Sequence, residues 1–419
     1  MSTPELLAAY DPPAEWKRVR LRWLSRRYAG GTPDTKNSEY WDRGQIPWLN
    51  SGAVNQGTIT EPSDYITELA LKESSAKWIP RGALVMALAG QGKTKATVGY
   101  LNIRATGNQS LAAIVPEKID GKYLYWWLSS QYLPLRNLSS QDGRDGLNLE
   151  MIGSIVCPIP PLDTQKRIAR FLDEKTAQID GLTEKKHALL NRLAEKRQAL
   201  ITRAVTKGLN PDAAMKPSGI DWLGDIPAHW EVKRLSSFCD FQSGKAHEPF
   251  IEPDGVFVCV NARFISTDGF AEKRCTENLT PARLGDILMV MSDLPNGRAL
   301  ARSFLVDDRA QYAVNQRVCR IRPQRGLPAY YSYQLNRNPQ LLAYDDGKEQ
   351  THLPNSAFKL VQLLQPPEEE QQNIVTYLDE VVSMLRATAK HVETSVNRLR
   401  EYRSALVTIA VTGQIAELR

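Results

Sequence analysis

Cysteine is scarce in this chain, and its few cysteines lie far apart. The 419 residues include five cysteines, and no two of them are closer than 16 positions. The odd number and the spacing argue against a disulfide framework, and the lack of any Cys-x-x-Cys pair argues against a zinc site. We therefore expect buried free thiols at all of these positions, Cys157, Cys239, Cys259, Cys275 and Cys319.

Long apolar runs are missing as well. No stretch of 18 or more consecutive apolar residues occurs, which excludes an ordinary membrane-spanning helix. The start, MSTPELLAAYDPPAEW, has neither the basic nor the apolar region of a secretory signal. These absences predict a cytoplasmic protein without a membrane partner.

Catalytic motifs are equally hard to find. The sequence lacks an Asn-Pro-Pro-aromatic or Asp-Pro-Pro-aromatic methyltransferase motif, a convincing nuclease or helicase set, and histidines at metal-binding spacing. What it does have is enough length for two or more domains. Its 53 basic and 47 acidic residues give a net charge of +6, which favours a polyanionic partner.

The most informative feature is an internal repeat. QKRIARFLDEKTAQID, which starts at Gln165, matches QQNIVTYLDEVVSMLR, which starts at Gln371, at an offset of 206 residues. The same offset holds without a gap through NRLAEKRQALITRAVT (191–206) and NRLREYRSALVTIAVT (397–412). The chain therefore contains two copies of one unit.

The segments upstream of these matches are diverged copies of each other. EWKRVRL around Trp16 resembles HWEVKRL around Trp230, and RGALVMAL (81–88) resembles LGDILMVM (284–291), but the offset varies between 203 and 214. Short apolar runs between Gly, Pro, Asn and Asp clusters predict a strand-rich mixed fold. Each copy thus consists of a globular module followed by a helical segment.

The helical segments carry the spacing of a coiled coil. In the second copy nine of eleven positions at alternating steps of four and three are apolar: Ile374, Leu378, Val381, Leu385, Thr388, Val392, Ser395, Leu399, Tyr402, Leu406 and Ile409. Prolines precede each segment, Asp163 or Thr164 is a candidate N-cap, and Glu368 to Glu370 suit the positive end of a helix dipole. A helix of about 41 residues spans about 60 Å and needs a partner helix. The other copy supplies one, in an antiparallel arrangement.

The sequence therefore predicts an α+β protein in which two pseudo-symmetric mixed α/β modules are joined by two long antiparallel coiled-coil helices. We expect six parts, with these bounds: first module 1–160, first helix 161–208, linker 209–225, second module 226–365, second helix 366–412 and tail 413–419. Two similar modules on a rigid spacer suit a long ligand with two-fold symmetry, such as duplex DNA. Because the modules have diverged, their two half-sites should differ.

Two motifs give this architecture a family resemblance. PPLDTQKRIARFLDE and PPEEEQQNIVTYLDE, which open the two helices, resemble the conserved-region signature of type I restriction-modification specificity subunits. The connector MKPSGIDWLGDIPAHWEVKRL (215–235) is also similar to the family's connector, although the chain start lacks a full copy of it. The resemblance covers the whole chain.

This resemblance implies a non-catalytic subunit with two target-recognition domains that bind an asymmetric, bipartite DNA sequence. It also implies two modification subunits, which carry S-adenosylmethionine and methylate adenine, and two restriction subunits, which use ATP and Mg²⁺. The chain itself would hold no cofactor or metal.

One motif points to a different function. Residues 87–94, ALAGQGKT, fit a relaxed nucleotide-binding P-loop in which Ala87 replaces the first glycine. A working P-loop needs a helix directly after it, and KATVGYL is a poor helix former. The motif match nevertheless leaves an ATPase as one alternative function. The other is a structural coiled-coil adaptor with two protein-binding modules, which would explain the repeat but not the signature.

The candidate DNA contacts lie on predicted loops. Gly92 would allow close backbone approach, Lys and Arg can neutralise phosphates, and Asn, Gln and Arg can pair with base edges. A solvated loop is the alternative for each, and the presence of an Asn-Gln pair in both modules favours a scaffold role for it. The candidates are Gln91, Gly92, Lys93, Lys95, Asn108, Gln109, Arg144, Asn296, Arg298, Arg302, Asn315, Gln316, Lys348 and His352.

Overall fold

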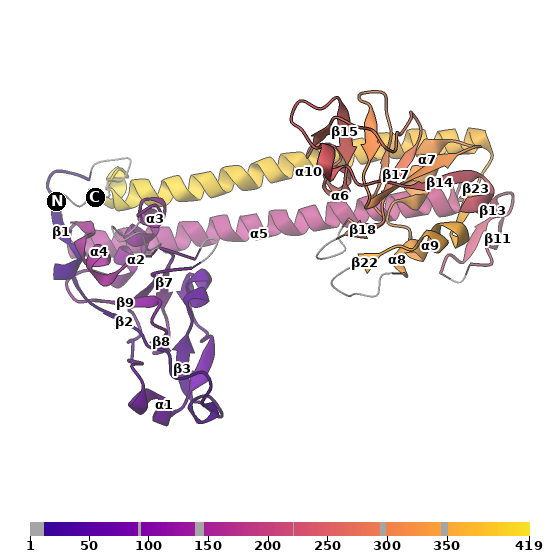
Figure 1. Cartoon of the computed structure of the whole chain (residues 1–419). Coiled ribbons are helices and arrows are strands. Elements are labelled where there is room, and N and C mark those ends of the chain that lie inside the picture. Colours follow the sequence, from indigo (N-terminus) through magenta and orange to yellow (C-terminus); the bar gives the residue numbers. More distant parts are fainter. Residues whose placement is uncertain (1–11, 91–93, 139–145, 221, 294–298, 345–350) are drawn as a thin grey trace. The chain divides into compact units, whose positions relative to one another are not determined.

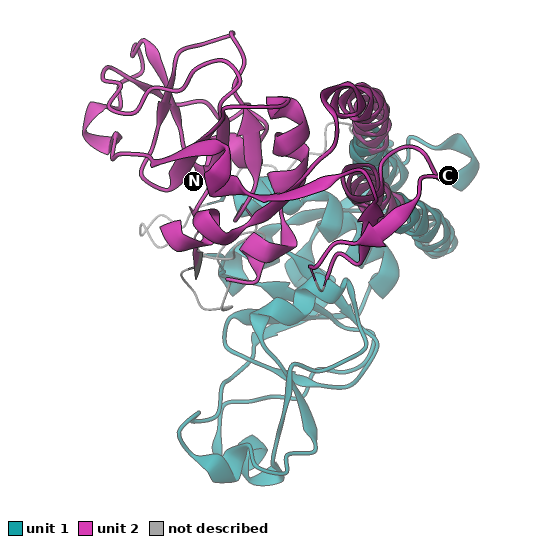
Figure 2. Cartoon of the chain, turned by 90° about the vertical axis from the view of Figure 1, so that its right-hand side faces the viewer, with its two compact units in different colours: residues 1–187, 393–419 teal, residues 188–392 magenta. Residues whose placement is uncertain are grey.

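A computed structural model describes residues 12–419 except 91–93, 139–145, 221, 294–298 and 345–350. The chain forms two compact units (Figure 2). Unit 1 comprises residues 1–187 and 393–419, and unit 2 comprises residues 188–392. The two long helices that the sequence predicts are present as α5 (Leu162–Lys207) and α10 (Glu368–Val411), the longest ribbons in Figure 1. Each of them contributes residues to both units.

Unit 1 contains a mixed α/β module. Its main sheet has the strand order β2 (Ser25–Ala29), β9 (Leu111–Pro116), β6 (Leu84–Ala87), β7 (Val98–Leu101) and β4 (Thr58–Ile59). A second sheet has the order β5 (Asp64–Ile66), β3 (Ile46–Leu49) and β8 (Thr106–Gly107), and β1 (Lys17–Arg20) pairs with β10 (Val156–Ile159). Its short helices are α1 (Glu68–Glu73), α2 (Gly121–Ser130), α3 (Tyr132–Arg136) and α4 (Leu149–Ser154).

Unit 2 has a similar topology, although its main sheet has four strands among the described residues and that of unit 1 has five. Its main sheet has the order β14 (Cys239–Ser243), β21 (Val318–Pro323), β17 (Ile287–Val290) and β19 (Ser303–Leu305). A three-stranded sheet has the order β16 (Arg274–Cys275), β15 (Phe257–Val260) and β20 (Tyr312–Val314), and β13 (Glu231–Arg234) pairs with β23 (Gln362–Gln365). The helices are α6 (Ala262–Ser266), α7 (Pro328–Leu335), α8 (Pro339–Leu342) and α9 (Asn355–Leu360). Two further pairs are β11 (Met215–Pro217) with β12 (Asp225–Pro227), and β18 (Ser292–Asp293) with β22 (Thr351–His352).

Each unit's core includes parts of both long helices. In unit 1 the start of α5 (Ile168, Leu172) shares a buried cluster with the end of α10 (Leu406, Ala410) and with Tyr123 of α2. In unit 2 the matching cluster takes its residues from the end of α5, the start of α10 and α7: Ile201, Ala204, Val205, Ile374, Leu378 and Tyr330. Within each unit the helix segments are therefore antiparallel, since the start of one packs with the end of the other.

The repeated proline-glutamine signature has a structural cause. The amide Nε2 of Gln165 donates to Pro160 O at 2.9 Å, and its Oε1 accepts from the backbone N of Asp120 at 2.8 Å. Gln371 does the same for Pro366 O (2.9 Å) and Leu327 N (2.8 Å). Each glutamine thus joins the first turn of a long helix to the backbone of its module.

The predicted caps of the first helix are wrong. The helix begins at Leu162, so Asp163 and Thr164 both lie inside its first turn. The first carbonyl of the helical pattern belongs to Pro161, which accepts from Gln165 N at 3.0 Å. Proline can take this place because it needs no N–H there.

The predicted apolar spacing also shifts within α5. Moved back by 206 residues, the eleven positions of the second helical segment predict Leu182 and Leu189 on the buried face of α5. These two residues are instead 45% and 43% exposed, whereas their neighbours Thr183 and Leu190 are half-buried. A straight helix drifts by about 20° per seven residues relative to a heptad repeat. The buried stripe therefore moves by one residue between the two ends of the helix.

In the described part of the chain no helix is long and apolar enough to cross a membrane. Among these same residues no group of three His, Cys, Asp or Glu side chains could hold a metal ion. All five cysteines are free and buried, as predicted.

Candidate nucleic-acid interface

The Asn-Gln pair lies on the same loop in both modules. Asn108 and Gln109 follow β8, and Asn315 and Gln316 follow β20. A glycine passes close behind each loop: a Cβ on Gly30 would lie 2.1 Å from Gly107 O, and one on Gly244 would lie 2.2 Å from Asn315 O. Only glycine fits at this approach, so both modules hold this loop by the same device.

Asn315 has a structural role. Its side chain is 5% exposed, and its Oδ1 accepts from the backbone N of His247 (3.2 Å) and of Gln316 (2.8 Å). Its Nδ2 donates to Glu248 Oε1 at 2.9 Å, and this hydrogen bond lowers the pKa of the Glu248 carboxyl. Because Asn315 already uses its donors and acceptors inside the module, these contacts favour the scaffold interpretation.

The other three residues of the two Asn-Gln pairs are more exposed to solvent than Asn315. Asn108 is half-buried and its Oδ1 accepts from Ser110 N at 3.1 Å, which is again a loop-shaping contact. Gln109 is exposed and accepts a hydrogen bond from the Thr32 hydroxyl. Gln316 is exposed beside the buried Asn315. The glutamines are thus better placed than the asparagines for an external ligand.

Next to Gln316 the second module has a cleft of about 630 Å³. It lies between the β20–β21 loop, α6 and the residues that precede β16 and β19. Its charged lining residues are Arg263, Lys273, Arg302, Arg317, Glu248 and Asp293. Amides of Asn261, Asn315 and Gln316 complete the polar lining. Four cations and two carboxylates leave the cleft positively charged.

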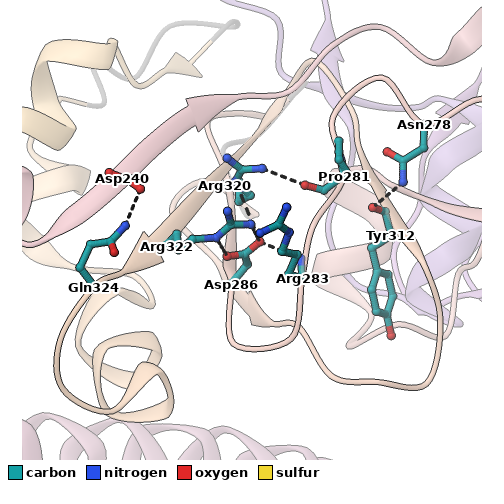
Figure 3. A network of polar contacts seen from close by, with 9 residues as sticks. All are labelled: Asp240, Asn278, Pro281, Arg283, Asp286, Tyr312, Arg320, Arg322 and Gln324. Carbon is teal, nitrogen blue, oxygen red and sulfur yellow. Dashed lines mark hydrogen bonds and ion pairs between the residues drawn. The ribbon is translucent and has the colours of Figure 1, made fainter.

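A buried ion-pair network supports the strand that leads away from this cleft (Figure 3). Asp286 is 1% exposed and receives two hydrogen bonds from Arg322, Nε to Oδ1 at 2.6 Å and NH2 to Oδ2 at 2.7 Å. Arg283 N donates to Asp286 Oδ2 at 2.8 Å, and Arg320 NH1 donates to Pro281 O at 2.8 Å. The network fastens β21, which begins directly after Arg317, to the segment before β17.

Arg320 is the member of this network whose charged form is disfavoured. Burial lowers the pKa of its guanidinium, and the neighbouring Arg322 lowers that pKa further. The hydrogen bond to Asp286 instead raises the pKa of Arg322. One carboxylate therefore serves two guanidinium groups, and its loss would leave both without their counter-ion.

The sequence candidates fall into three groups. Arg302, Asn315 and Gln316 line the cleft, and His352 is exposed in β22. Lys95 is only 6% exposed and its Nζ donates to Leu138 O at 3.1 Å, an arrangement that favours a structural role over the expected phosphate contact. Outside the described residues lie Gln91, Gly92, Lys93, Arg144, Asn296, Arg298 and Lys348.

Sequence reasoning missed three of the cleft's four cations. Arg263 and Lys273 reach the cleft through the turn after β15 and the pairing of β15 with β16, which no local pattern reveals. Arg317 directly follows Gln316, so its position in the sequence was a usable signal.

The P-loop motif does not lie in a P-loop. The expected strand before it exists as β6, but from Thr94 the described chain turns back, and Ala96 N donates to Ala87 O at 2.9 Å. It then forms β7, which is antiparallel to β6. Because a strand rather than a helix follows, no helix N-terminus is available to a phosphate here.

Known proteins are similar to this chain in sequence and in fold. The model of the type I restriction modification DNA specificity domain matches residues 13–192 and 227–398. The Escherichia coli EcoR124I/EcoR124II specificity subunit is 29% identical over 184 residues, 43% of this chain and 45% of that protein. The Methanocaldococcus jannaschii MjaIX specificity subunit is 27% identical over 243 residues, 55% and 53% of the two chains.

The chain thus spans about half the length of the curated relatives it matches. A chain solved in work on complex assembly and conformational transition of the type I restriction-modification system has a similar fold. Its TM-score is 0.72 at 16% identity, over 96% of this chain and 99% of that one. Because the family model matches 352 of the 419 residues and both modules, this chain belongs to the type I restriction-modification DNA specificity family.

Proposed function

We propose that this chain is the DNA-specificity subunit of a type I restriction-modification enzyme. The observation that carries the proposal is that both modules match the DNA specificity domain while differing from each other in sequence. Two diverged modules would read two different half-sites. The two long helical segments that the sequence predicts between the modules support a spacer of fixed length between the half-sites.

In this proposal the chain binds duplex DNA and works with two modification subunits and two restriction subunits in the cytoplasm. It performs no catalysis and holds no cofactor, and S-adenosylmethionine, ATP and Mg²⁺ act on the partner subunits. The positively charged cleft supports the DNA-binding role, since cations that neutralise phosphates supply most non-specific affinity. The adaptor alternative offers no reason for the family match, and the β6–β7 hairpin argues against the ATPase alternative.

A binding experiment tests the proposal. The chain is co-expressed and purified with its cognate modification subunit, and the complex is titrated with fluorescent genomic duplexes at increasing salt. We expect co-purification, and binding whose logarithmic constant falls linearly with the logarithm of salt concentration. A stable complex without any DNA affinity would contradict the proposal and favour the adaptor.

A further inference from the structure

The two modules share a backbone framework, which allows their residues to be compared position by position. The residues at the end of β17 form the same backbone hydrogen bonds in the second module as the residues at the end of β6 form in the first. These bonds are Val290 N to Arg302 O (3.0 Å), Ala87 N to Thr97 O (3.0 Å), Met291 N to Arg317 O (2.9 Å) and Leu88 N to Ser110 O (2.8 Å). Arg302 therefore corresponds to Thr97, and Arg317 corresponds to Ser110.

The other two cleft cations can be matched in the same way. Asn261 and Asn50 cap the turns after β15 and β3, so Arg263, two residues on, corresponds to Gly52. Lys273 O accepts from Cys259 N in the pairing of β15 with β16. The equivalent partner in the pairing of β3 with β5 is Asp64, opposite Trp48.

The comparison shows a large difference in charge. The four cleft positions of the second module carry Arg263, Lys273, Arg302 and Arg317, whereas the first module carries Gly52, Asp64, Thr97 and Ser110 there. The formal charge of the four positions thus changes from +4 to −1 while the supporting backbone stays the same. A difference confined to side chains on a shared framework indicates different ligand contacts rather than a different fold.

The cleft cations also keep their donors available. Across the described residues the side chains of Arg263, Lys273 and Arg317 form neither a hydrogen bond nor an ion pair, and all three are exposed. Arg302 donates to Ser266 O at 3.3 Å. The cleft's Glu248 accepts a hydrogen bond from Asn315, and the charge of Arg317 also lowers the pKa of this carboxyl. Positive charge of this kind suits a polyanion that enters from solvent.

We propose that the two modules divide the work of DNA binding unequally. The cleft of the second module grips the phosphate backbone beside its half-site through Arg263, Lys273 and Arg317, and the equivalent surface of the first module forms no such contacts. The inference rests on the proposed function and deepens it. Phosphate contacts fix position without reading sequence, so these cations set affinity and salt dependence and leave the recognised motif unchanged.

The test compares two triple variants in the complete complex with the modification subunit. The first is Arg263→Gln, Lys273→Gln and Arg317→Gln. The matched control, Lys233→Gln, Arg274→Gln and Arg309→Gln, removes the same charge from the same module at exposed, ion-paired positions outside the cleft. Both are titrated with a duplex that carries the wild-type methylation motif, at 50 to 200 mM salt, and the melting midpoint verifies folding.

We expect the cleft variant to lower the slope of log K against log salt by about two to three, since each phosphate contact contributes about 0.9. The control should change it by less than about one, and the methylation motif should stay the same in both. An unchanged slope in the cleft variant would overturn the inference. So would a relaxed half-site at unchanged slope, because the cations would then read bases. If the wild-type complex binds no DNA, the proposed function fails instead.

Discussion

At the scale of single residues, the two signature glutamines each satisfy two backbone groups at once. Gln371 accepts a hydrogen bond from Leu327 N and donates one to Pro366 O, and its side chain is only 2% exposed. Replacing it would leave a half-buried backbone donor and a buried acceptor without partners. Such groups cost about 1 to 3 kcal/mol each when their partner is removed.

Gln371→Ala should therefore lower the free energy of unfolding by about 2 to 4 kcal/mol. The neighbouring Gln372 is exposed, so Gln372→Ala provides the control. Urea unfolding followed by tryptophan fluorescence measures both. Equal midpoints for the two variants would show that the glutamine does not fasten the helix to the module.

Asp286 is a second residue whose contribution can be isolated. Asp286→Ala removes the carboxylate that serves Arg322 and Arg320, and removing one partner of a buried ion pair costs about 2 to 4 kcal/mol after allowance for partial exposure. Asp254→Ala, at an exposed acid, should cost less than about 0.5 kcal/mol. The check is the difference between their thermal unfolding midpoints, and the account fails here if the two shifts are the same.

The buried thiols give a prediction about pH. Burial raises the pKa of Cys239 to about 12 and that of Cys259 to about 12, and it also raises those of Cys157 and Cys319. An unfolded thiol ionises near 8.5, so the folded state keeps a proton that the unfolded state releases. The thiols thus stabilise the fold fully below pH about 8.5, and that stabilisation is lost as the pH rises above it.

Because the thiolate is the reactive form, iodoacetamide at pH 8 should modify these cysteines on the order of a thousandfold more slowly in the folded chain than in guanidinium. Mass spectrometry of timed samples measures the difference. Labelling of the folded chain at the unfolded rate would mean that the thiols are accessible.

At the scale of elements, both long helices end on a glycine beside a buried tryptophan. Gly208, after α5, has φ +72° and lies against Trp230, and Gly413, after α10, has φ +70° and lies against Trp16. A left-handed residue at this place is the common end of an α-helix. The two tryptophans are those that the diverged repeat aligns, so the repeat explains where both helices stop.

Gly413→Ala should lower the free energy of unfolding more than the same change at another left-handed glycine. A Cβ at Gly413 would lie 2.8 Å from the Trp16 ring, whereas one at Gly219, with φ +73°, meets nothing within 4 Å. Gly219→Ala should cost about 1 to 2 kcal/mol from backbone strain alone. Gly413→Ala should cost about 1 to 3 kcal/mol more, from overpacking. Comparable melting midpoints of the two variants would contradict this explanation of the helix end.

The elements also mark the limit of what the sequence can predict. Apolar periodicity and the 206-residue offset predict α5, α10, β6 and β17 correctly, because these elements depend on local pattern. The candidate site depends instead on pairings between distant segments. Lys273 reaches the cleft because β16 pairs with β15, and Lys95 turns inward, where its Nζ donates to Leu138 O. Neither contact leaves a signal in the sequence around these residues.

One pair of positions shows how far the copies have diverged on a common backbone. In unit 1 Asp180 of α5 accepts from Arg403 of α10, with Nε to Oδ1 at 2.8 Å. The residues at the same repeat positions in unit 2 are Arg386 and Arg197, which repel each other, and Arg386 pairs instead with Asp268 at 3.1 Å. The repeat therefore conserves packing rather than charge at these positions.

At the scale of the whole molecule, two matched modules with unlike surfaces explain why one chain would recognise an asymmetric DNA sequence. The two modules are held in the same way by features that they share. These are the hydrogen bonds of Gln165 and Gln371, the close approach of a glycine to each Asn-Gln loop, and the glycines after the long helices. The parts that differ are the loops and the cleft cations, where a ligand would bind. In the proposed function, stability and DNA binding would thus depend on separate sets of residues.

The most direct test is to sequence the methylome of a host that expresses this chain with its modification subunit, beside a host that lacks only this chain. The account predicts a methylated-adenine motif with two unlike half-sites and a spacer of fixed length, present only when the chain is present. If the modification subunit is active and no such motif depends on the chain, the chain does not read DNA sequence, and the account is wrong.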